Sequence, residues 1–520
     1  MDCDSMGEQI SSNKTIAKNT IFLYLRMMFT MVVSLFTSRV NLSVLGVEDN
    51  GIYQLVGGVV AMFAFLNGSL SGATSRFLTF ELGRGENERL KDTFAAALSI
   101  HILVALIVLI LAETVGMWFL ENKLVIPEER MNAARIVYQL SVLASMISIT
   151  QVPYNASIIS HERMNVFAYM SILDVSLKLL ICYLLYITPF DRLITFGVLV
   201  LIVTTVIQII YRAYCIRNFE ECHFKLVKDY SIIKPIFAFA GWDMFGNFSV
   251  MARGQGVNMI LNMFFGPAIN AAAGFSTTIG NCISGFSNNF LTAIRPPIVK
   301  AYSQNRIDKM EDLMINASKY SFSLLLLLST PFVFESKFIL DIWLKTPPEY
   351  TDIFCVLELG LSVLSSIFLP LVFAIHASGK IRFMSIVNGT IWFTVVPFTY
   401  VLLKMGYSPV VPYVTKIILL AFVVVSNLYS TKKNIPDFDI VMYLRKAFVP
   451  SFCSLIIVMS TTYLVYKQFN GSSIIRFLAS CTTSTLTVIL VTYYVVFDKY
   501  AQDAINKKVR GMLKGIFNRR

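Results

Sequence analysis

Long apolar stretches, separated by short polar segments, recur along almost the whole chain and constrain its fold more than any other feature. Each is long enough for a membrane-spanning helix, which needs about 20 mostly apolar residues. Each is also continuous, unlike the alternating pattern of a barrel strand. The predicted spans cover residues 19–45, 51–79, 93–119, 133–157, 165–188, 193–212, 232–265, 269–298, 313–344, 352–377, 382–404, 409–429, 443–466 and 473–496.

The composition agrees with a membrane protein. Of the 520 residues 56% are hydrophobic and 15% are charged, whereas an ordinary soluble protein has about 25% charged residues. This balance excludes a soluble enzyme, a disordered regulator and a secreted disulfide scaffold. No segment between spans exceeds about 20 residues, so there is no room for an external catalytic domain, and we expect a protein that is not an enzyme.

The net charge of +12 could indicate nucleic acid, but the positions of the cations argue against it. Lys and Arg favour the cytoplasmic side of a membrane protein. With the N-terminus inside, only six of them fall in outer segments: Lys123, Arg130, Arg192, Lys345, Lys404 and Lys467. The bias predicts a multi-pass protein with both termini cytoplasmic and no nucleic-acid partner. We expect no metal site, since the cluster Cys215, Cys222 and His223 is an incomplete ligand set.

A weak internal repeat indicates two lobes. A shift of 217 residues places Val40-Asn41 on Val257-Asn258, Gly57 on Gly274 and Gly68 on Gly285. An even number of spans in each unit gives both copies the same orientation, as in parallel-repeat transporters. The predicted order is a cytoplasmic segment (1–18), a six-helix lobe (19–230), a second six-helix lobe (231–435), two further spans (436–497) and a basic cytoplasmic tail (498–520). Chance similarity among apolar segments is the alternative.

The second and eighth spans are unusually polar. Polar groups that face lipid would lack hydrogen-bond partners, so these faces are expected to border a wet cavity between the lobes. Close helix packing through small residues is the alternative. The candidate cavity-lining residues are Asn67, Ser71, Thr74, Thr277, Asn281 and Asn288.

Arginines within the predicted spans are the sharpest functional signal. A charge in hydrocarbon costs at least about 2.5 kcal/mol, and Arg binds phosphate through a planar fork of donors. We therefore expect an anionic, phosphate-bearing ligand. Arg76 and Arg295, near cytoplasmic helix ends, could instead reach lipid phosphates. The candidate pyrophosphate-binding residues are Arg26, Arg39, Arg76, Arg253 and Arg295.

Carboxylates are scarce in the same spans. Asp243 falls on Arg26 under the repeat shift, and we predict that the two residues form a pair. Lys178 is expected to pair with Asp174, one turn earlier on the same helix. Asp174 and Glu358 are the deepest other carboxylates and are the candidates for a coupling-ion site.

The segment SRVNLSVLGVEDNGIYQLVGGVVAMFAFLNGSLSGATSRFLTFELGRG resembles the flippases of lipid-linked O-antigen and capsular oligosaccharides, within the multidrug/oligosaccharidyl-lipid/polysaccharide exporter (MOP) superfamily. The features that carry the resemblance are LGVEDNGIY and SGATSRFLTFELGRG. The family implies an all-α fold of about fourteen transmembrane helices, two pseudo-symmetric six-helix lobes plus two C-terminal helices, with a cationic central cavity. Cation-coupled relatives generally place an acidic residue in the first span, whereas this chain has Arg26 and Arg39 there.

The resemblance implies a flippase that moves an undecaprenyl-pyrophosphate-linked oligosaccharide across the bacterial inner membrane by alternating access. It implies no cofactor, with either protons or sodium as the coupling ion. The expected partners are the lipid bilayer, the polyprenyl-pyrophosphate oligosaccharide, and polymerase and other glycan-assembly proteins. A cation-coupled multidrug or metabolite antiporter of the same superfamily is the first alternative, and a membrane-embedded glycan polymerase is the second.

Overall fold

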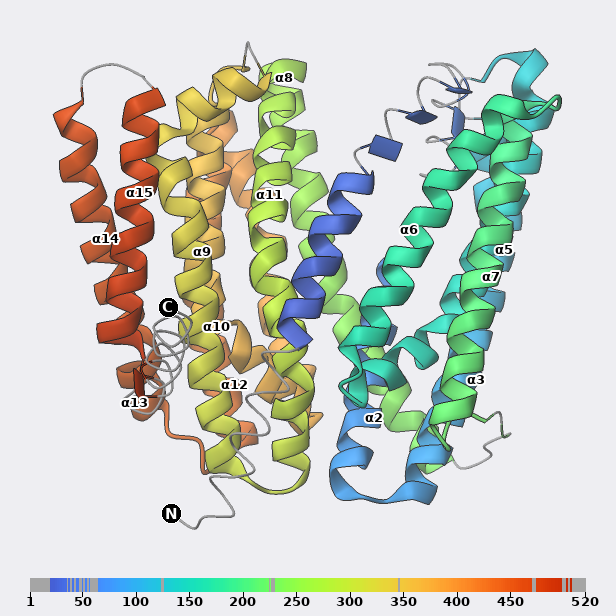
Figure 1. The fold of residues 1–520 in the computed structure, drawn as a ribbon, viewed down its shortest axis with the longest axis horizontal. Helices are drawn as coiled ribbons and strands as arrows, with labels where there is room; N and C mark the ends of the chain where they lie inside the picture. Colours follow the sequence, from blue (N-terminus) through green and yellow to red (C-terminus); the bar gives the residue numbers. More distant parts are fainter. Residues whose placement is uncertain are drawn as a thin grey trace, which may run out of the picture. The chain divides into compact units, whose positions relative to one another are not determined.

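The computed structural model describes residues 19–34, scattered positions between 36 and 56, and then 64–122, 126–223, 225, 230–344, 347–469, 474–497, 502, 503 and 506. Every regular element in this part of the chain is a helix. A first helix covers Asn19–Ser34. The helices that follow (Figure 1) are α2 (Ala64–Arg84), α3 (Asn87–Leu111), α4 (Met117–Asn122), α5 (Glu128–Ser160), α6 (Met164–Ile187), α7 (Arg192–Asn218), α8 (Tyr230–Ser303), α9 (Ile307–Leu344), α10 (Thr351–Ser378), α11 (Arg382–Lys404), α12 (Val411–Asn434), α13 (Ile440–Tyr443), α14 (Val449–Gln468) and α15 (Ile474–Val491).

The predicted spans and the helices agree closely. Ten helical stretches within the described residues are long and apolar enough to cross a membrane. The four other predicted spans coincide with the helix 19–34, with α2 and with the two arms of α8. Short π-helical turns join α3 to α4 and α13 to α14 without ending the span. The predicted all-α membrane fold is therefore confirmed.

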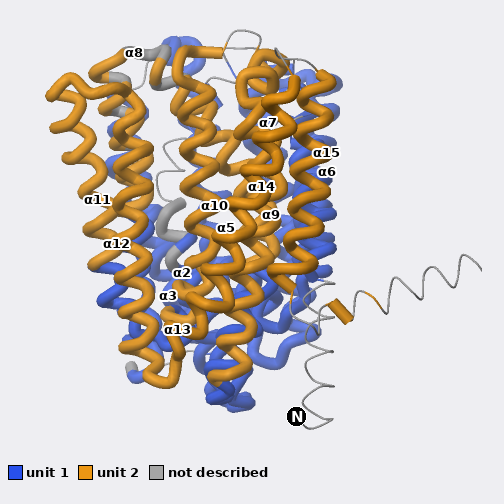
Figure 2. Tube along the Cα trace, turned by 90° about the vertical axis from the view of Figure 1, so that its left-hand side faces the viewer, with its two compact units in different colours: residues 1–248, 292–306, 376–386 blue, residues 249–291, 307–375, 387–520 orange. Residues whose placement is uncertain are grey.

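The chain forms two compact units, which Figure 2 distinguishes by colour. The first unit contains residues 1–248, 292–306 and 376–386, and the second contains 249–291, 307–375 and 387–520. Three segments of the predicted second lobe thus belong to the first unit: the start of α8 (231–248), the end of α8 (292–306) and the turn from α10 to α11 (376–386). The predicted lobe boundary at 230/231 stays a prediction.

Helix α8 is a hairpin rather than a rod, although its helical hydrogen bonding is continuous over 74 residues. A Cβ atom built on Gly72 would lie 3.4 Å from Asp243 Oδ2 and 3.5 Å from an Arg295 nitrogen. Residues roughly 50 positions apart in a straight helix would be separated by ~80 Å. The chain therefore reverses between the two predicted spans, and both ends of α8 lie in the first unit.

Connecting segments of the first unit meet at one end of its helices. Arg130, near the start of α5, donates to Asp49 at 2.6 and 2.8 Å and to Asp191 at 2.5 Å. Burial acts to raise the pKa of Asp191, but hydrogen bonds from Arg130 and from the Ile194 N–H outweigh it and leave that pKa below its usual value. Arg130 thus ties the connection that contains Asp49 of the LGVEDNGIY turn to the connection that contains Asp191.

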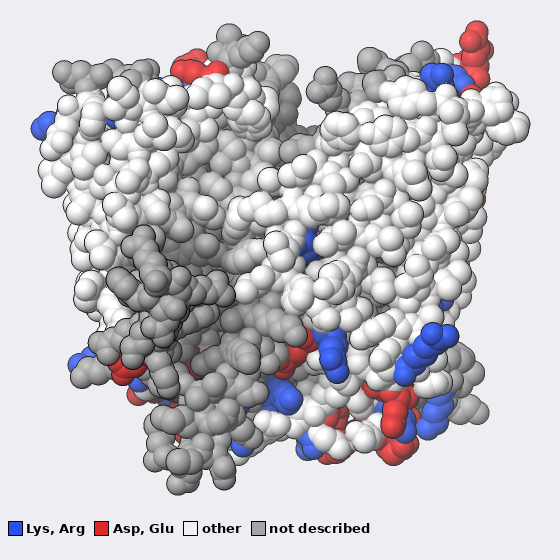
Figure 3. Space-filling view, in the orientation of Figure 1, with Lys and Arg blue, Asp and Glu red and all other residues white. Residues whose placement is uncertain are grey.

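The opposite end of the first unit carries its own charged network. His161 Nε2 lies 2.7 Å from Glu221, and Lys225 lies 3.2 Å from Asp92. Figure 3 shows charged side chains gathered at the end that carries the α2–α3 connection, while the flank between the two ends is almost uncoloured. This distribution suits a unit that crosses a bilayer.

A buried ion pair joins α9 to α15 in the second unit. Pro331 interrupts the hydrogen bonding of α9, and Glu335 has non-helical backbone angles four residues later. The Glu335 carboxylate is fully buried and accepts two hydrogen bonds from Arg476, at 2.7 and 2.8 Å. The last helix is therefore held to the kink of α9 by a bidentate pair.

We predict that Arg476→Met lowers the free energy of unfolding by about 3–5 kcal/mol, because it leaves a buried carboxylate without its cation. The thermal midpoint of the purified protein in detergent measures this loss. The double variant Glu335→Leu/Arg476→Met removes both charges and is expected to be more stable than Arg476→Met alone. A double variant that is less stable than the single one would contradict the assignment.

Candidate functional site

Three polar side chains come together in the first unit. Asp243 lies on the first arm of α8, Arg295 on the second arm and His376 at the end of α10. His376 Nε2 is 3.5 Å from Asp243 Oδ1, and its Nδ1 is 3.5 Å from an Arg295 nitrogen. Arg295 also donates to the Gly72 carbonyl at 3.3 Å, and Asn247 donates to Asp243 at 3.2 Å. An acid, an imidazole and a guanidinium thus share one site between spanning helices.

The predicted Arg26–Asp243 pair is replaced by these contacts. Arg26 lies over the ring of Phe167 at 4.8 Å, and the ion-pair partner that the structure shows for Asp243 is His376. The repeat shift made Arg26 and Asp243 equivalent positions of two copies, but equivalence does not bring residues into contact. His376, one of four histidines and the only one in span 352–377, was the signal that sequence reasoning missed.

Arg76 binds the backbone at the end of α10. Its Nε donates to the His376 carbonyl at 3.1 Å and another nitrogen donates to the Ala377 carbonyl at 2.8 Å. The last carbonyls of a helix have no partner within the helix, so a cation there satisfies them and complements the helix dipole. A Cβ atom at Gly379, where φ is +75°, would lie 2.7 Å from the same guanidinium. Glycine therefore allows this close approach.

The surroundings of Arg76 are apolar. Its guanidinium carbon lies 4.4 Å from the ring centre of Phe77, 4.7 Å from that of Phe80 and 5.9 Å from that of Phe239. The residue is only 6% exposed. Arg76 was a candidate ligand for pyrophosphate, and the structure instead gives it two carbonyl acceptors and an aromatic enclosure. We interpret it as a helix cap.

We predict that Arg76→Leu lowers the free energy of unfolding by about 2–4 kcal/mol, because two buried carbonyls lose their donors. Arg84→Leu is the matched control, because Arg84 is the last residue of α2, the helix that carries Arg76, and its side chain is 40% exposed. This variant should change the free energy of unfolding by less than about 0.5 kcal/mol. Thermal midpoints of both variants measure the difference. Full stability of Arg76→Leu would contradict the role of Arg76 as a helix cap.

The second unit holds a separate group of charges. Lys416 of α12 lies 3.1 Å from Glu358 of α10, and Arg253 of α8 is close enough to interact electrostatically with both. The Arg253 guanidinium lies 4.2 Å from the ring centre of Trp392 on α11. Two cations therefore share one carboxylate, and this group keeps a positive charge.

Two further contacts hold this group in place. The Lys416 ammonium lies 4.6 Å from the ring centre of Tyr413, whose hydroxyl is 3.0 Å from Ser276 Oγ. A Cβ atom at Gly280 would lie 3.0 Å from the Glu358 side chain, so the glycine leaves room for the carboxylate. Among the described residues, the buried Arg253 Nε has no hydrogen-bond acceptor.

Each carboxylate that is a candidate for ion coupling forms an ion pair with a lysine. Asp174 lies 2.8 Å from Lys178, which confirms that predicted pair, and Glu358 lies 3.1 Å from Lys416. Whether either carboxylate takes part in coupling stays a prediction. Asp243 beside His376 is a third acidic position with a titratable neighbour.

The predicted cavity-lining residues differ in exposure. Ser71 is half-buried, Thr74 is buried, and Thr277, Asn281 and Asn288 are exposed. Thr277 donates to the Ala273 carbonyl of its own helix at 2.9 Å. The side chain of Asn67 and the whole of Arg39 lie outside the described residues. A role in lining a cavity stays a prediction for all six.

No family model and no curated protein matches the chain, but solved structures do. One is an outward-facing multidrug resistance MATE family transporter of the MOP superfamily (TM-score 0.65, 14% identity, covering 81% of this chain and 96% of that one). Another is a variant of the Vibrio cholerae MATE transporter VcmN (TM-score 0.60, 15% identity, 84% and 100%). A third is a MOP superfamily transporter from Pyrococcus furiosus (TM-score 0.55, 15% identity, 81% and 94%).

The chain has the MATE fold. The expected fold is thus confirmed, and the solved structures that share it are described as transporters. Identities of 14–15% show the fold alone, because one fold can host several functions. What this chain does must therefore be argued from its own cationic group in the second unit and its acid–imidazole–guanidinium group in the first.

Proposed function

We propose that this protein is a flippase that moves an undecaprenyl-pyrophosphate-linked oligosaccharide across the inner membrane of a bacterium by alternating access. The observation that carries the proposal is the uncompensated charge at Arg253. Its only nearby carboxylate, among the described residues, is already paired with Lys416. An anionic ligand would supply the missing negative charge.

The geometry at Arg253 suits a phosphate. Trp392 packs against the face of the guanidinium at 4.2 Å, which orients the group and leaves its N–H edge for a ligand. Arg holds phosphate through two parallel N–H donors in the plane of the group. A cation desolvated in this way gains more from an anionic ligand than an exposed one.

The other arginines have different parts in the proposal. Arg295 would also contact the ligand, but it lies beside Asp243 and His376, so its charge is partly balanced. Arg26 contributes a second cation in the first unit, and Arg76 serves as the cap of α10. We propose that the exposed polar residues Asn281 and Asn288 of α8 contact the sugars.

The remaining assignments belong to the same proposal. Both termini would be cytoplasmic, protons or sodium would drive the cycle, and the protein would work beside a glycan polymerase and other assembly proteins. Asp243 joins Asp174 and Glu358 as a candidate for the coupling ion, because it is a largely buried carboxylate on a spanning helix, in contact with Asn247 and His376.

A multidrug or metabolite antiporter fits the fold as well, since one structural neighbour is a multidrug resistance transporter. The excess positive charge near Arg253 disfavours cationic drugs as cargo. The Pyrococcus furiosus neighbour is described as having a binding pocket of reverse polarity that suggests a different function, which supports arguing cargo from charge rather than from the fold.

We predict that Arg253→Gln reduces surface glycan at least tenfold without lowering the protein level, because the neutral side chain cannot hold pyrophosphate. The measurement is surface glycan in a strain that depends on this gene, with protein quantified in the membrane fraction. Arg382→Gln is the matched control. Arg382 is the first residue of α11, and its guanidinium carbon lies 5.0 Å from the ring centre of Trp242. This variant should leave surface glycan unchanged.

Arg253→Lys keeps the charge but loses the fork, so we expect partial recovery of surface glycan. Normal glycan in Arg253→Gln would overturn the pyrophosphate contact. Growth in toxic cations, with and without the gene, tests the antiporter, and glycan chain elongation by the purified protein tests the polymerase.

A further inference from the structure

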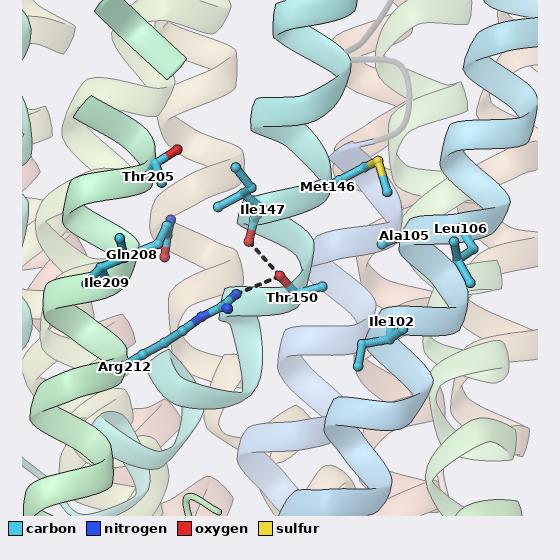
Figure 4. A pocket seen from close by; sticks show the side chains of 10 residues that line it. All are labelled: Ile102, Ala105, Leu106, Met146, Ile147, Thr150, Thr205, Gln208, Ile209 and Arg212. Carbon is cyan, nitrogen blue, oxygen red and sulfur yellow. Dashed lines mark hydrogen bonds between the residues drawn. The ribbon is translucent and has the colours of Figure 1, made fainter. Parts of the chain in front are cut away.

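We propose that the first unit binds an anionic phospholipid in a groove between α3, α5 and α7, with the lipid phosphate on Arg212. This site is separate from the residues assigned above to transport. The groove has a volume of about 320 Å³, within the range of ligand sites in proteins. Figure 4 shows the residues that line it, which include Ile102, Leu106, Met146, Thr150, Gln208 and Arg212.

Arg212 lies at the polar end of this groove. It donates to Thr150 Oγ1 at 2.8 Å and to Gln151 Oε1 at 3.3 Å, and its guanidinium carbon is 5.4 Å from the ring centre of Tyr154. Figure 4 shows its side chain directed toward Thr150. All these partners are neutral, and within the described part of the chain Arg212 forms no ion pair. Its charge is left for a ligand to balance.

Part of the lining of the groove is apolar and exposed. Ile102, Leu106 and Ile209 are 38%, 47% and 61% exposed, and they lie on helices that are long and apolar enough to span a membrane. Such side chains face lipid in a membrane protein. The occupant of the groove is therefore a lipid rather than a water-soluble anion.

The polarity of the groove matches the layout of a phospholipid. Arg212 is six residues from the end of α7, or ~9 Å along the helix, which places its charge toward one membrane interface. Gln208 lies one turn deeper and also lines the groove. Its amide is thus level with the ester groups of a lipid whose phosphate contacts Arg212.

The deeper part of the groove fits acyl chains. Leu106 and Met146 line it beyond Gln208, toward the middle of the spanning helices. A lipid held in this way has its phosphate on a guanidinium and its chains along apolar side chains, which satisfies both requirements of the groove at once. A zwitterionic lipid brings its own cation and leaves the charge of Arg212 unbalanced.

The test uses the purified full-length protein in nanodiscs of phosphatidylcholine, with and without roughly 20–30% phosphatidylglycerol as the anionic lipid. We expect phosphatidylglycerol to raise the thermal midpoint of the wild type and to be retained in native mass spectra. Arg212→Gln should lose the shift and reduce retained phosphatidylglycerol at least fivefold. Arg217→Gln, an exposed arginine on the same helix, is the matched control and should behave as the wild type.

A second variant tests the proposal even if Arg212→Gln misfolds. Leu106→Trp fills the apolar end without touching the hydrogen bonds of Arg212, and it should also lose retained phosphatidylglycerol. Equal retention by the wild type, Arg212→Gln and Leu106→Trp would overturn the proposal. Equal stabilisation by phosphatidylcholine, or displacement of phosphatidylglycerol by one equivalent of polyprenyl phosphate, would overturn the assignment of an anionic phospholipid. Surface glycan is not a readout here, so failure of this proposal is distinct from failure of the flippase.

Discussion

A cation inside a membrane must find a partner, and this single constraint organises the structure. Three arginines of the described part of the chain meet it in different ways. Arg476 has a buried carboxylate, and Arg76 has the carbonyls at the end of α10. Arg253 has an aromatic face and a carboxylate that it shares with Lys416. Arg476 and Arg76 have all the partners they need, and both stabilise the fold. The group of Arg253, Lys416 and Glu358 keeps an excess positive charge, so we look for the function there.

The same principle separates structural charge from functional charge more reliably than position in the sequence. Arg76 and Arg253 both lie in spans of the predicted repeat, and both were candidate ligands for an anion. Their surroundings differ, because one meets backbone acceptors that a helix end always leaves unpaired and the other does not. Arg212 lies in an ordinary apolar span, yet its neutral partners leave its charge equally unbalanced.

Much of the fold could be predicted because spanning helices are local structures. A run of about 20 apolar residues determines a helix and its ends without help from distant residues, and the predicted spans match the helices from 64–84 through 474–496 closely. The pair Asp174–Lys178 was predictable for the same reason, since its partners are one turn apart. The candidate site was not predictable in this way, because its residues come from different helices.

The sequence by itself determined the class of fold, the number and places of the spans and the presence of surplus cations, since all of these follow from composition and short-range periodicity. Only the tertiary structure decided which cations are satisfied. In the folded protein Asp243 lies beside His376 rather than Arg26, and Glu358 pairs with Lys416. The physical reason is that the partner of a buried charge is the nearest group in space, and helix packing, rather than order along the chain, determines which group that is.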